Sequence, residues 1–292
     1  MPLTPNVVAA LAMLAAVGAF SLMDAGLKVL VGHYPAIQVA ALRGAASLPL
    51  VLAWALATVG PRALVHVRWP LHLLRGVLSV AMMVGFAYGL RSLPLSTAYT
   101  LFFIAPLLVT ALSVPVLGER VGPRRWSAIL VGLLGVLVVM RPTGEGLFTL
   151  GALAVLLAAA CYSVSAIAVR VLGRTDSTQA MVVWMVTMLA IGAGILAAPV
   201  WVQVRAEHWL LIAGIGVTGA LGQYGITEAF RRGEASVIAP LEYTALAWGV
   251  ALDLALWGVL PDAITWLGAA IIVASGLYLL RRERAHAQAE HP

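Results

Sequence analysis

The chain is predicted to be an all-α membrane protein of ten transmembrane helices, built as two inverted repeats of five. Three observations carry this prediction. The 292 residues are 62% hydrophobic and 10% charged, with a mean hydropathy of +0.99, whereas ordinary globular domains are about 45–50% apolar. The apolar residues form segments of membrane-spanning length. Residues of the first half also recur in the second half at a spacing of about 140.

Short clusters of Gly, Pro and charged residues separate the apolar segments, and each segment approaches the roughly 20 residues that a spanning helix needs. The predicted helices are 7–31, 35–59, 69–91, 95–117, 123–140, 147–172, 177–203, 207–231, 234–260 and 262–281. The N-terminus lacks the basic region of a signal peptide, so the first segment is predicted to remain as a helix. The loops leave no room for a soluble domain, and residues 283–292 are predicted to form a disordered cytoplasmic tail.

The repeat divides the chain into residues 1–142 and 143–282. The matching pairs are Arg91 and Arg231, Ser96 and Ser236, Gly118 and Gly258, Trp126 and Trp266, Phe20 and Tyr162, Ser21 and Ser163, and Lys28 and Arg170. Five helices per copy is an odd number, so the second copy must enter the membrane from the opposite side. Inverted repeats of this kind are typical of carriers that work by alternating access.

The arginines outside the helices predict the orientation. Eleven gather on one side: Arg62, Arg68, Arg120, Arg124, Arg125, Arg174, Arg231, Arg232, Arg281, Arg282 and Arg284. The other side has Arg91, Arg141 and Arg205. Because short cytoplasmic loops are enriched in Lys and Arg, both termini are predicted to be cytoplasmic.

Several classes of protein are disfavoured. The net charge of +6 comes from arginines between apolar segments, which form no basic face for nucleic acid. The six histidines are scattered and do not resemble a metal site, and no phosphate loop, zinc helix or nucleophile turn is found. We therefore expect no catalytic residues, no metal and no cofactor. The expected partners are a small-molecule substrate and the lipid bilayer; the oligomeric state stays open.

Charged residues within the spans are candidates for a gate, because a charge near the bilayer centre costs at least about 2.5–3.5 kcal/mol unless it finds a partner. Asp24 and Lys28 are four residues apart, a spacing at which their side chains meet on one helical face. They could satisfy each other, or face the pathway together with Arg43. Glu242 could meet a substrate or pair with Arg231 or Arg232. Asp253 and Glu228 are further acidic residues in the spans, while Arg75 and Arg170 lie near helix ends and are expected to extend towards the interface.

Deep aromatic and methionine side chains suit either ordinary helix packing or a cavity for an aromatic or amphipathic solute. The candidates for the cavity are Phe20, Met82, Tyr99, Phe103, Tyr162, Ser165, Trp184, Gln223, Tyr224, Tyr243 and Trp248. Pro106 and Pro240 remove backbone hydrogen bonds from helices 4 and 9. They are predicted either to be hinges or to bend their helices permanently. Gly85 and Gly89 should allow a close helix contact.

The chain resembles the ten-helix exporter branch of the drug/metabolite transporter superfamily, the EamA type, along nearly its whole length. The residues that carry the resemblance are Gly118, Glu119 and Arg120 at the end of helix 4, Pro240 to Tyr243 at the start of helix 9, and the glycine-rich helices 5 and 10. Val259 stands where the second copy would repeat Glu119.

The resemblance implies a transporter in the bacterial inner membrane with a central cavity lined mainly by helices 3, 4, 8 and 9, together with parts of helices 1, 2, 6 and 7. The deep aromatic residues favour an aromatic-amino-acid exporter of the YddG type within that branch. The expected function is secondary transport of small organic metabolites, outward, by alternating access. A multidrug exporter, a passive facilitator or channel, and a membrane-embedded enzyme are the alternatives, in that order.

Overall fold

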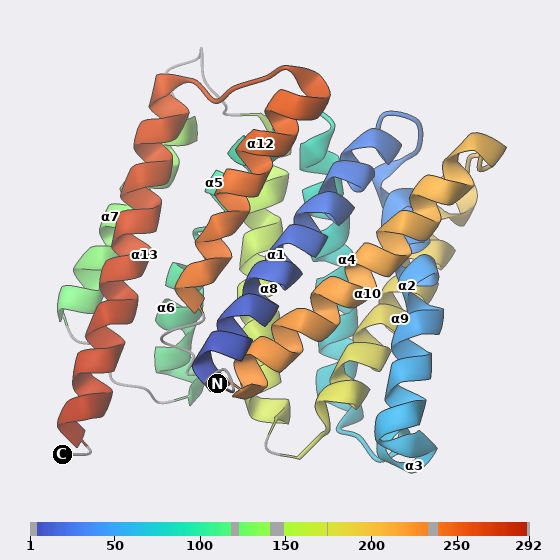
Figure 1. The fold of residues 1–292 in the computed structure, drawn as a ribbon, viewed down its shortest axis with the longest axis horizontal. Helices are drawn as coiled ribbons and strands as arrows, with labels where there is room; N and C mark the ends of the chain where they lie inside the picture. Colours follow the sequence, from blue (N-terminus) through green and yellow to red (C-terminus); the bar gives the residue numbers. More distant parts are fainter. Residues whose placement is uncertain (1–4, 118–122, 141–148, 174, 233–238, 291–292) are drawn as a thin grey trace.

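The computed structural model describes residues 5–117, 123–140, 149–173, 175–232 and 239–290. Every regular element in these ranges is an α-helix or a short 3-10 helix. The helices stand side by side as a bundle (Figure 1). The all-helical prediction is therefore confirmed for the described part of the chain.

The elements are as follows. The first half contains α1 (Pro5–Leu30), α2 (Ala36–Thr58), α3 (Gly60–Val65), α4 (Trp69–Leu90), α5 (Leu95–Phe102), α6 (Ala105–Leu117) and α7 (Pro123–Met140). The second half contains α8 (Leu150–Leu172), α9 (Thr178–Ala197), η1 (Ala198–Val200), η2 (Ala206–His208), α10 (Trp209–Arg232), η3 (Ala239–Thr244), α12 (Ala245–Trp257) and α13 (Ala263–Glu290).

Seven of these stretches are long and apolar enough to cross a membrane, and two shorter apolar helices, 126–139 and 263–275, accompany them. The seven follow apolar runs, which lipid favours because a helix satisfies its own backbone polar groups. The protein is thus a multi-pass membrane protein. The full count of ten spans and the cytoplasmic placement of the termini stay predictions.

Two predicted helices are interrupted in the structure. The predicted helix 95–117 is divided into α5 and α6 at Phe103 and Ile104, and Pro106 follows in the first turn of α6. Proline has no amide hydrogen, so the backbone ladder cannot continue through it. In the second half the predicted helix 234–260 begins, within the described residues, as the 3-10 helix η3, which contains Pro240. It continues as α12, which ends where Gly258 adopts a φ of +65°.

The last helix is longer than predicted. α13 continues to Glu290, past the predicted end at residue 281 and through most of the segment for which the sequence predicts disorder. The added residues are mainly Ala, Arg, Glu and Gln, which have high helix propensity. Their polarity makes the segment a poor continuation of a membrane span.

The main contacts between helices reflect the repeat. Each of them is found again when both helices are replaced by their counterparts in the other half. α1 packs on α10 as α8 packs on α4, and α2 packs on α10 as α9 packs on α4. α2 with α9, α5 with α12 and α7 with α13 are pairs of counterparts. In Figure 1, α7 and α13 form one edge of the bundle and α2, α3 and α9 form the other.

Glycines allow the closest of these contacts. A Cβ atom on Gly85 would lie 2.8 Å from the Ala154 carbonyl oxygen, and one on Gly89 would lie 3.0 Å from that of Gly151. The predicted close approach through Gly85 and Gly89 is therefore confirmed, with α8 as the partner. Glycine is required there because any larger residue would push the two helices apart.

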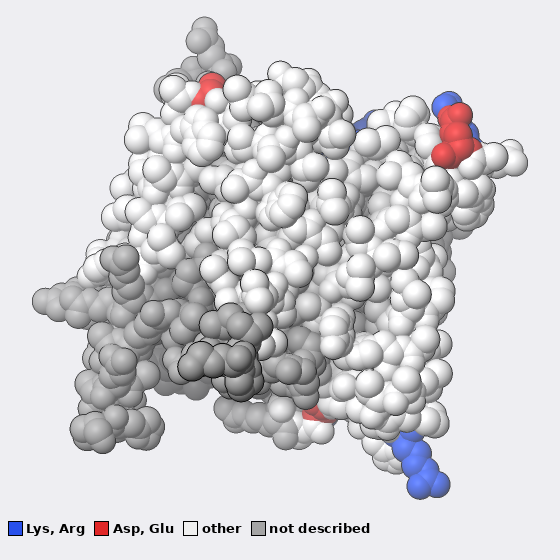
Figure 2. Space-filling view, in the orientation of Figure 1, with Lys and Arg blue, Asp and Glu red and all other residues white. Residues whose placement is uncertain are grey.

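Charged side chains mark the two ends of the bundle. In Figure 2 the coloured Lys, Arg, Asp and Glu atoms lie along two opposite edges, and the described surface between them is white. We call the face on which α1 begins and α13 ends the termini face, and the opposite face the far face (Figure 1). The termini face includes α3 and the segment between α8 and α9, whereas the far face includes residues 31–35 and 198–208.

Candidate functional site

The charged residues of α1 pair with other helices. Lys28 Nζ lies 3.0 Å from Asp253 Oδ1 and sits 4.3 Å from the centre of the Trp257 ring. Asp24 instead accepts a 2.8 Å hydrogen bond from the Tyr99 hydroxyl. Asp24 and Lys28 therefore do not form the pair that their spacing allows. Partners on α5 and α12 lie closer to each group than the two groups lie to one another.

Asp253 is the most heavily bonded buried charge among the described residues. Its side chain is fully buried on α12. Besides Lys28, it accepts hydrogen bonds from the amides of Leu95 and Ser96 at 3.0 and 2.8 Å and from the Ser96 hydroxyl at 2.8 Å. These amides begin α5 and have no partner within that helix. A carboxylate is well suited to them because the helix dipole makes this end positive.

Arg43 is buried on α2 and close to the Asp24 site. Its Nε donates to Met23 Sδ at 3.4 Å, and its charge interacts with Asp24 without direct ion pairing. Asp24, Tyr99 and Arg43 thus form one cluster. Lys28, which the sequence-based hypothesis groups with Asp24 and Arg43, pairs with Asp253 instead. Sequence reasoning includes Asp253 among the intramembrane charges but assigns it no site. Its position in the apolar run of α12 was the available signal.

Aromatic rings continue from this cluster along α4, α5 and α8. Tyr99 stacks on Phe86 with ring centres 6.2 Å apart, Phe86 contacts Phe102 at 5.7 Å, and Phe102 contacts Tyr162 at 5.4 Å. Two of these four rings, those of Tyr99 and Tyr162, are predicted cavity residues. The chain of rings runs past the interruption between α5 and α6.

A second aromatic pair lies at the interruption before α12. Phe103 and Tyr243 meet edge to face with ring centres 5.0 Å apart. The Tyr243 hydroxyl is buried without a hydrogen-bond partner among the described residues. Glu242 is half-buried and lies near Tyr162 and Tyr243. The side chains of Arg231 and Arg232, its predicted alternative partners, lie outside the described residues.

The other predicted cavity residues are distributed over the bundle. Phe20 lies against Gly222, Trp248 against Gly18, and Met82 against the main core. The Tyr224 ring meets that of Trp54 at 6.0 Å, and Gln223 is half-buried with a polar interaction of its own. The structure therefore does not bring all the predicted cavity residues together.

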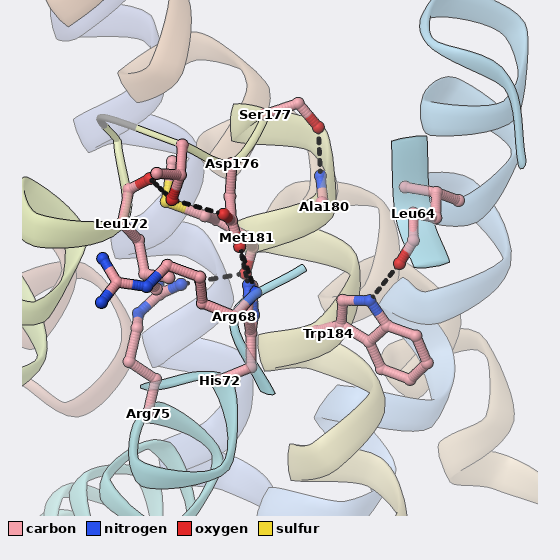
Figure 3. A network of polar contacts seen from close by, with 11 residues as sticks. Leu64, Arg68, His72, Arg75, Leu172, Asp176, Ser177, Ala180, Met181 and Trp184 are labelled. Carbon is pink, nitrogen blue, oxygen red and sulfur yellow. Dashed lines mark hydrogen bonds and ion pairs between the residues drawn. The ribbon is translucent and has the colours of Figure 1, made fainter. Parts of the chain in front are cut away.

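Trp184 and the predicted hinge residues complete the set. Trp184 donates from Nε1 to the Leu64 carbonyl at 2.7 Å and meets the Trp69 ring at 4.6 Å, which places it near the termini face (Figure 3). The side chains of Pro106 and Pro240 lie outside the described residues, although both helix interruptions occur beside them.

Arg75 is buried instead of extending towards the interface. It is 5% exposed on α4, and its guanidinium reaches the Met181 carbonyl at 3.2 Å (Figure 3). It also contacts Ser165 Oγ at 3.4 Å and Met185 Sδ at 3.7 Å. The expectation that it snorkels is wrong, because α8 and α9 cover this part of α4. Ser165, a predicted cavity residue, is thus an Arg75 contact. The side chain of Arg170 is outside the described part of the chain.

At the termini face, a carboxylate joins the two halves. Asp176, between α8 and α9, accepts from the Arg68 amide at 2.9 Å and lies 2.9 Å from His72 Nε2, both at the start of α4 (Figure 3). Thr175 donates to the same carboxylate at 2.6 Å. We call Asp176, Arg68 and His72 the termini-face latch. Burial acts to raise the pKa of the Asp176 carboxyl, but the hydrogen bonds from Thr175, Arg68 and His72 outweigh burial and lower the pKa below its usual value.

An equivalent contact exists at the far face. Tyr34, between α1 and α2, accepts from the Arg205 amide at 3.0 Å, and its hydroxyl lies 2.6 Å from His208 Nδ1, at the start of α10. We call Tyr34, Arg205 and His208 the far-face latch. Each latch joins the first helix connection of one half to the start of the third long helix of the other. Sequence reasoning misses both, since residues near a loop give no periodic signal.

A match to known proteins places these features in a family. The model of the EamA-like transporter family matches residues 7–141 and again 149–281. The chain is 30% identical to a riboflavin transporter of Vibrio cholerae over 88% of this chain and 86% of that protein. It is 28% identical to the pseudopaline exporter CntI of Pseudomonas aeruginosa, covering 91% and 93% of the two chains.

Further similarities agree with this assignment. An S-adenosylmethionine uptake transporter of Rickettsia conorii is 28% identical over 75% of this chain and 74% of its own. A crystal structure superposes with a TM-score of 0.62 at 20% identity, covering 91% of this chain and 96% of the other, and it shows the same fold. The chain therefore belongs to the EamA-like transporter family of the drug/metabolite transporter superfamily, and it is a multi-pass membrane transporter of small molecules.

Proposed function

We propose that the protein is a secondary transporter that exports a small amphipathic organic solute, with an aromatic amino acid as the best candidate, across the bacterial inner membrane. Transport occurs by alternating access between the two halves. The chemistry of transport needs no enzymatic step, cofactor or metal in this proposal. Both termini lie in the cytoplasm, in agreement with the arginine distribution.

The observation that carries this proposal is the equivalence of the two latches. Each joins one half of the chain to the other, and the two lie at opposite faces of the bundle. Alternating access requires contacts between halves that release at one face while those at the other face hold. Hydrogen bonds near helix connections can be broken at modest cost, because water can reach the polar groups when they separate.

The nature of the solute is supported by the aromatic chain from Tyr99 to Tyr162 and by the relatives. Those relatives are named for riboflavin, pseudopaline and S-adenosylmethionine, which are small organic molecules, and their names include both export and uptake. Aromatic rings and methionines adapt to amphipathic shapes. The outward direction is supported by the resemblance to the exporter branch.

Counterflow in proteoliposomes tests this function. Vesicles containing purified protein are loaded with one member of a panel of amino acids and amphipathic dyes, and uptake of the labelled solute is followed with and without a pH gradient. A carrier accelerates uptake when unlabelled solute is inside and saturates with concentration. A passive channel shows neither effect, and that result would remove the alternating-access proposal. Preference for dyes over every amino acid would favour the multidrug alternative.

A paired experiment addresses the latches directly. Cys161 is the chain's single cysteine and is replaced by Ala, after which either His72 and Asp176 or Tyr34 and His208 are changed to cysteines. Cross-linking either pair should stop counterflow, and reduction should restore it. Unaltered counterflow after complete cross-linking would show that the faces need not open.

A further inference from the structure

Arg75 is a buried cation whose described partners are all neutral. Its contacts are a hydroxyl, a backbone carbonyl and a thioether. Lys28 has the Asp253 carboxylate at 3.0 Å, and Arg43 interacts with Asp24. No described carboxylate lies within ion-pair distance of the Arg75 guanidinium. Buried charges in proteins are usually paired, because an unpaired one loses its hydration without compensation.

The Asp176 carboxylate, which lies in the same network of polar contacts in Figure 3, is already occupied. Asp176 accepts from the Arg68 amide, His72 and Thr175. It forms no ion pair with Arg75, although His72 and Arg75 are three residues apart and share one face of α4. The charge of Asp176 is therefore committed to the termini-face latch.

One ring nitrogen of His72, near Arg75, lacks a hydrogen-bond partner among the described residues. His72 is 1% exposed, and its Nδ1 has no hydrogen-bond partner among the described residues while Nε2 contacts Asp176. A buried polar atom without a partner is unusual in folded proteins and calls for an explanation. An unpaired cation and an unpaired ring nitrogen thus lie one turn apart on α4 (Figure 3).

The surroundings can adapt to a guest. The sulfur of Met185 on α9 contacts the guanidinium, as does the backbone carbonyl of Met181, and the Met188 side chain packs against Gly76. Methionine side chains are unbranched and change shape at low cost. The Ser165 hydroxyl, which now accepts from Arg75, can rotate to donate to an oxygen instead.

From these observations we infer that Arg75 binds a carboxylate of the transported solute, at a site between α4, α8 and α9 next to the termini-face latch. The planar guanidinium matches the two oxygens of a carboxylate better than a lysine could. Ser165 donates a hydrogen bond to that group, and His72 can donate a further one from Nδ1 when the ring is doubly protonated, a form in which Nε2 still donates to Asp176. This inference rests on the proposed transport function and specifies which part of the solute the protein recognises.

Binding to the purified full-length protein in detergent tests the inference without transport. The thermal unfolding midpoint is measured against increasing phenylacetate, phenyl phosphate and the uncharged phenylacetamide. A ligand that binds the folded state raises the midpoint. We expect phenylacetate to raise it in the wild type, and Arg75→Gln to weaken phenylacetate binding by about 10-fold or more. Phenylacetamide binding should change little.

Two further variants separate recognition from folding. Arg75→Lys keeps the charge but loses the planar fork, so we expect an affinity between those of the wild type and Arg75→Gln. Arg62→Gln removes an exposed arginine on α3 and should leave binding unchanged. If phenylacetate fails to bind the wild type, or binds Arg75→Gln and Arg75→Lys as tightly as the wild type, the inference is wrong. Stronger binding of phenyl phosphate than of phenylacetate would overturn the choice of a carboxylate.

Counterflow of phenylacetate distinguishes this inference from the function on which it rests. Arg75-dependent binding without counterflow would remove the transport proposal and leave the binding site standing. Counterflow that Arg75→Gln leaves unaltered would support transport and remove the site.

Discussion

The two latches hold equivalent connections with different chemistry. At the far face a neutral phenol hydroxyl lies between the Arg205 amide and His208. At the termini face a carboxylate accepts from the Arg68 amide and lies against His72. The two latches have equivalent positions but different chemical groups. We therefore expect them to hold the two faces together with different strengths. Acid should weaken the carboxylate latch, because protonation of Asp176 removes the charge that accepts these hydrogen bonds.

The difference extends one turn into the membrane. Three residues after His72 stands Arg75, whereas three residues after His208 stands Leu211, which packs against Gly26. The termini-face latch therefore has a buried cation beside it, and the far-face latch has an apolar contact. The two halves share a framework but differ at this position, where one half has the cation that we propose binds the solute.

The largest effect is expected from removing the carboxylate of the termini-face latch. Asp176→Ala leaves the Arg68 amide and His72 without their acceptor, and hydrogen bonds to a charged group contribute about 1.5–3 kcal/mol. We expect a loss of that size in the free energy of unfolding, measured by denaturant titration in mixed micelles. Asp176→Asn keeps the shape and should recover part of it. Equal unfolding free energies for Asp176→Ala and the wild type would show that the termini-face latch does not stabilise the fold.

Lowering the pH should produce the next largest effect. The pKa of Asp176 is below its usual value in the folded protein, so its contribution to stability is present above the usual aspartate pKa of about 3.9. The contribution is lost as the pH falls through the lower, folded value. The difference in unfolding free energy between wild type and Asp176→Asn should therefore shrink on acidification.

Tyr34→Phe is expected to act more weakly than Asp176→Ala. It removes the hydroxyl that contacts Arg205 and His208 but leaves the ring in place, and neutral hydrogen bonds contribute about 0.5–1.5 kcal/mol. The unfolding free energy should fall by about 1 kcal/mol. A cysteine introduced by His33→Cys should also react faster with thiol reagents. A larger loss than that of Asp176→Ala would reverse the ranking of the two latches.

The smallest effect is expected at the edge of the far-face latch. Glu207 lies 3.8 Å from His208 Nε2 and 3.5 Å from Arg205, but its side chain is 66% exposed. Solvent screens such pairs, so Glu207→Gln should change the unfolding free energy by no more than about 0.5 kcal/mol. A larger change in the thermal unfolding midpoint would mean that the charge of Glu207 contributes to the stability of the far-face latch.

The sequence predicts the helices well because each apolar run must satisfy its own backbone in lipid. The predicted helix 123–140 coincides with α7, and the contact at Gly85 and Gly89 follows from residue size alone. The helix interruption at Phe103 is less predictable. Pro106 marks the region, but proline also occurs in helices that merely bend.

Partners of polar residues are much harder to predict. A spacing of four shows that Asp24 and Lys28 could meet, but it carries no information on Tyr99 or Asp253, which come from distant helices. Arg75 stands near the start of its helix, where extension to the interface is usual, and only the packing of α8 and α9 shows that it is covered. Trp184 lies inside an apolar run, yet its Nε1 reaches the Leu64 carbonyl near the termini face.

The bonding of Asp253 constrains how the far face can move. Its carboxylate, on α12, accepts hydrogen bonds from Lys28 on α1 and from the first amides of α5. Separating any of these segments would strand a buried negative charge, a change that costs about 3–5 kcal/mol when one partner of a buried pair is lost. In the proposed alternating-access cycle, we therefore expect the far-face ends of α1 and α12 and the start of α5 to stay together. Opening of the far face would then depend on the contacts of Tyr34 and Gln38 with the segment that leads into α10.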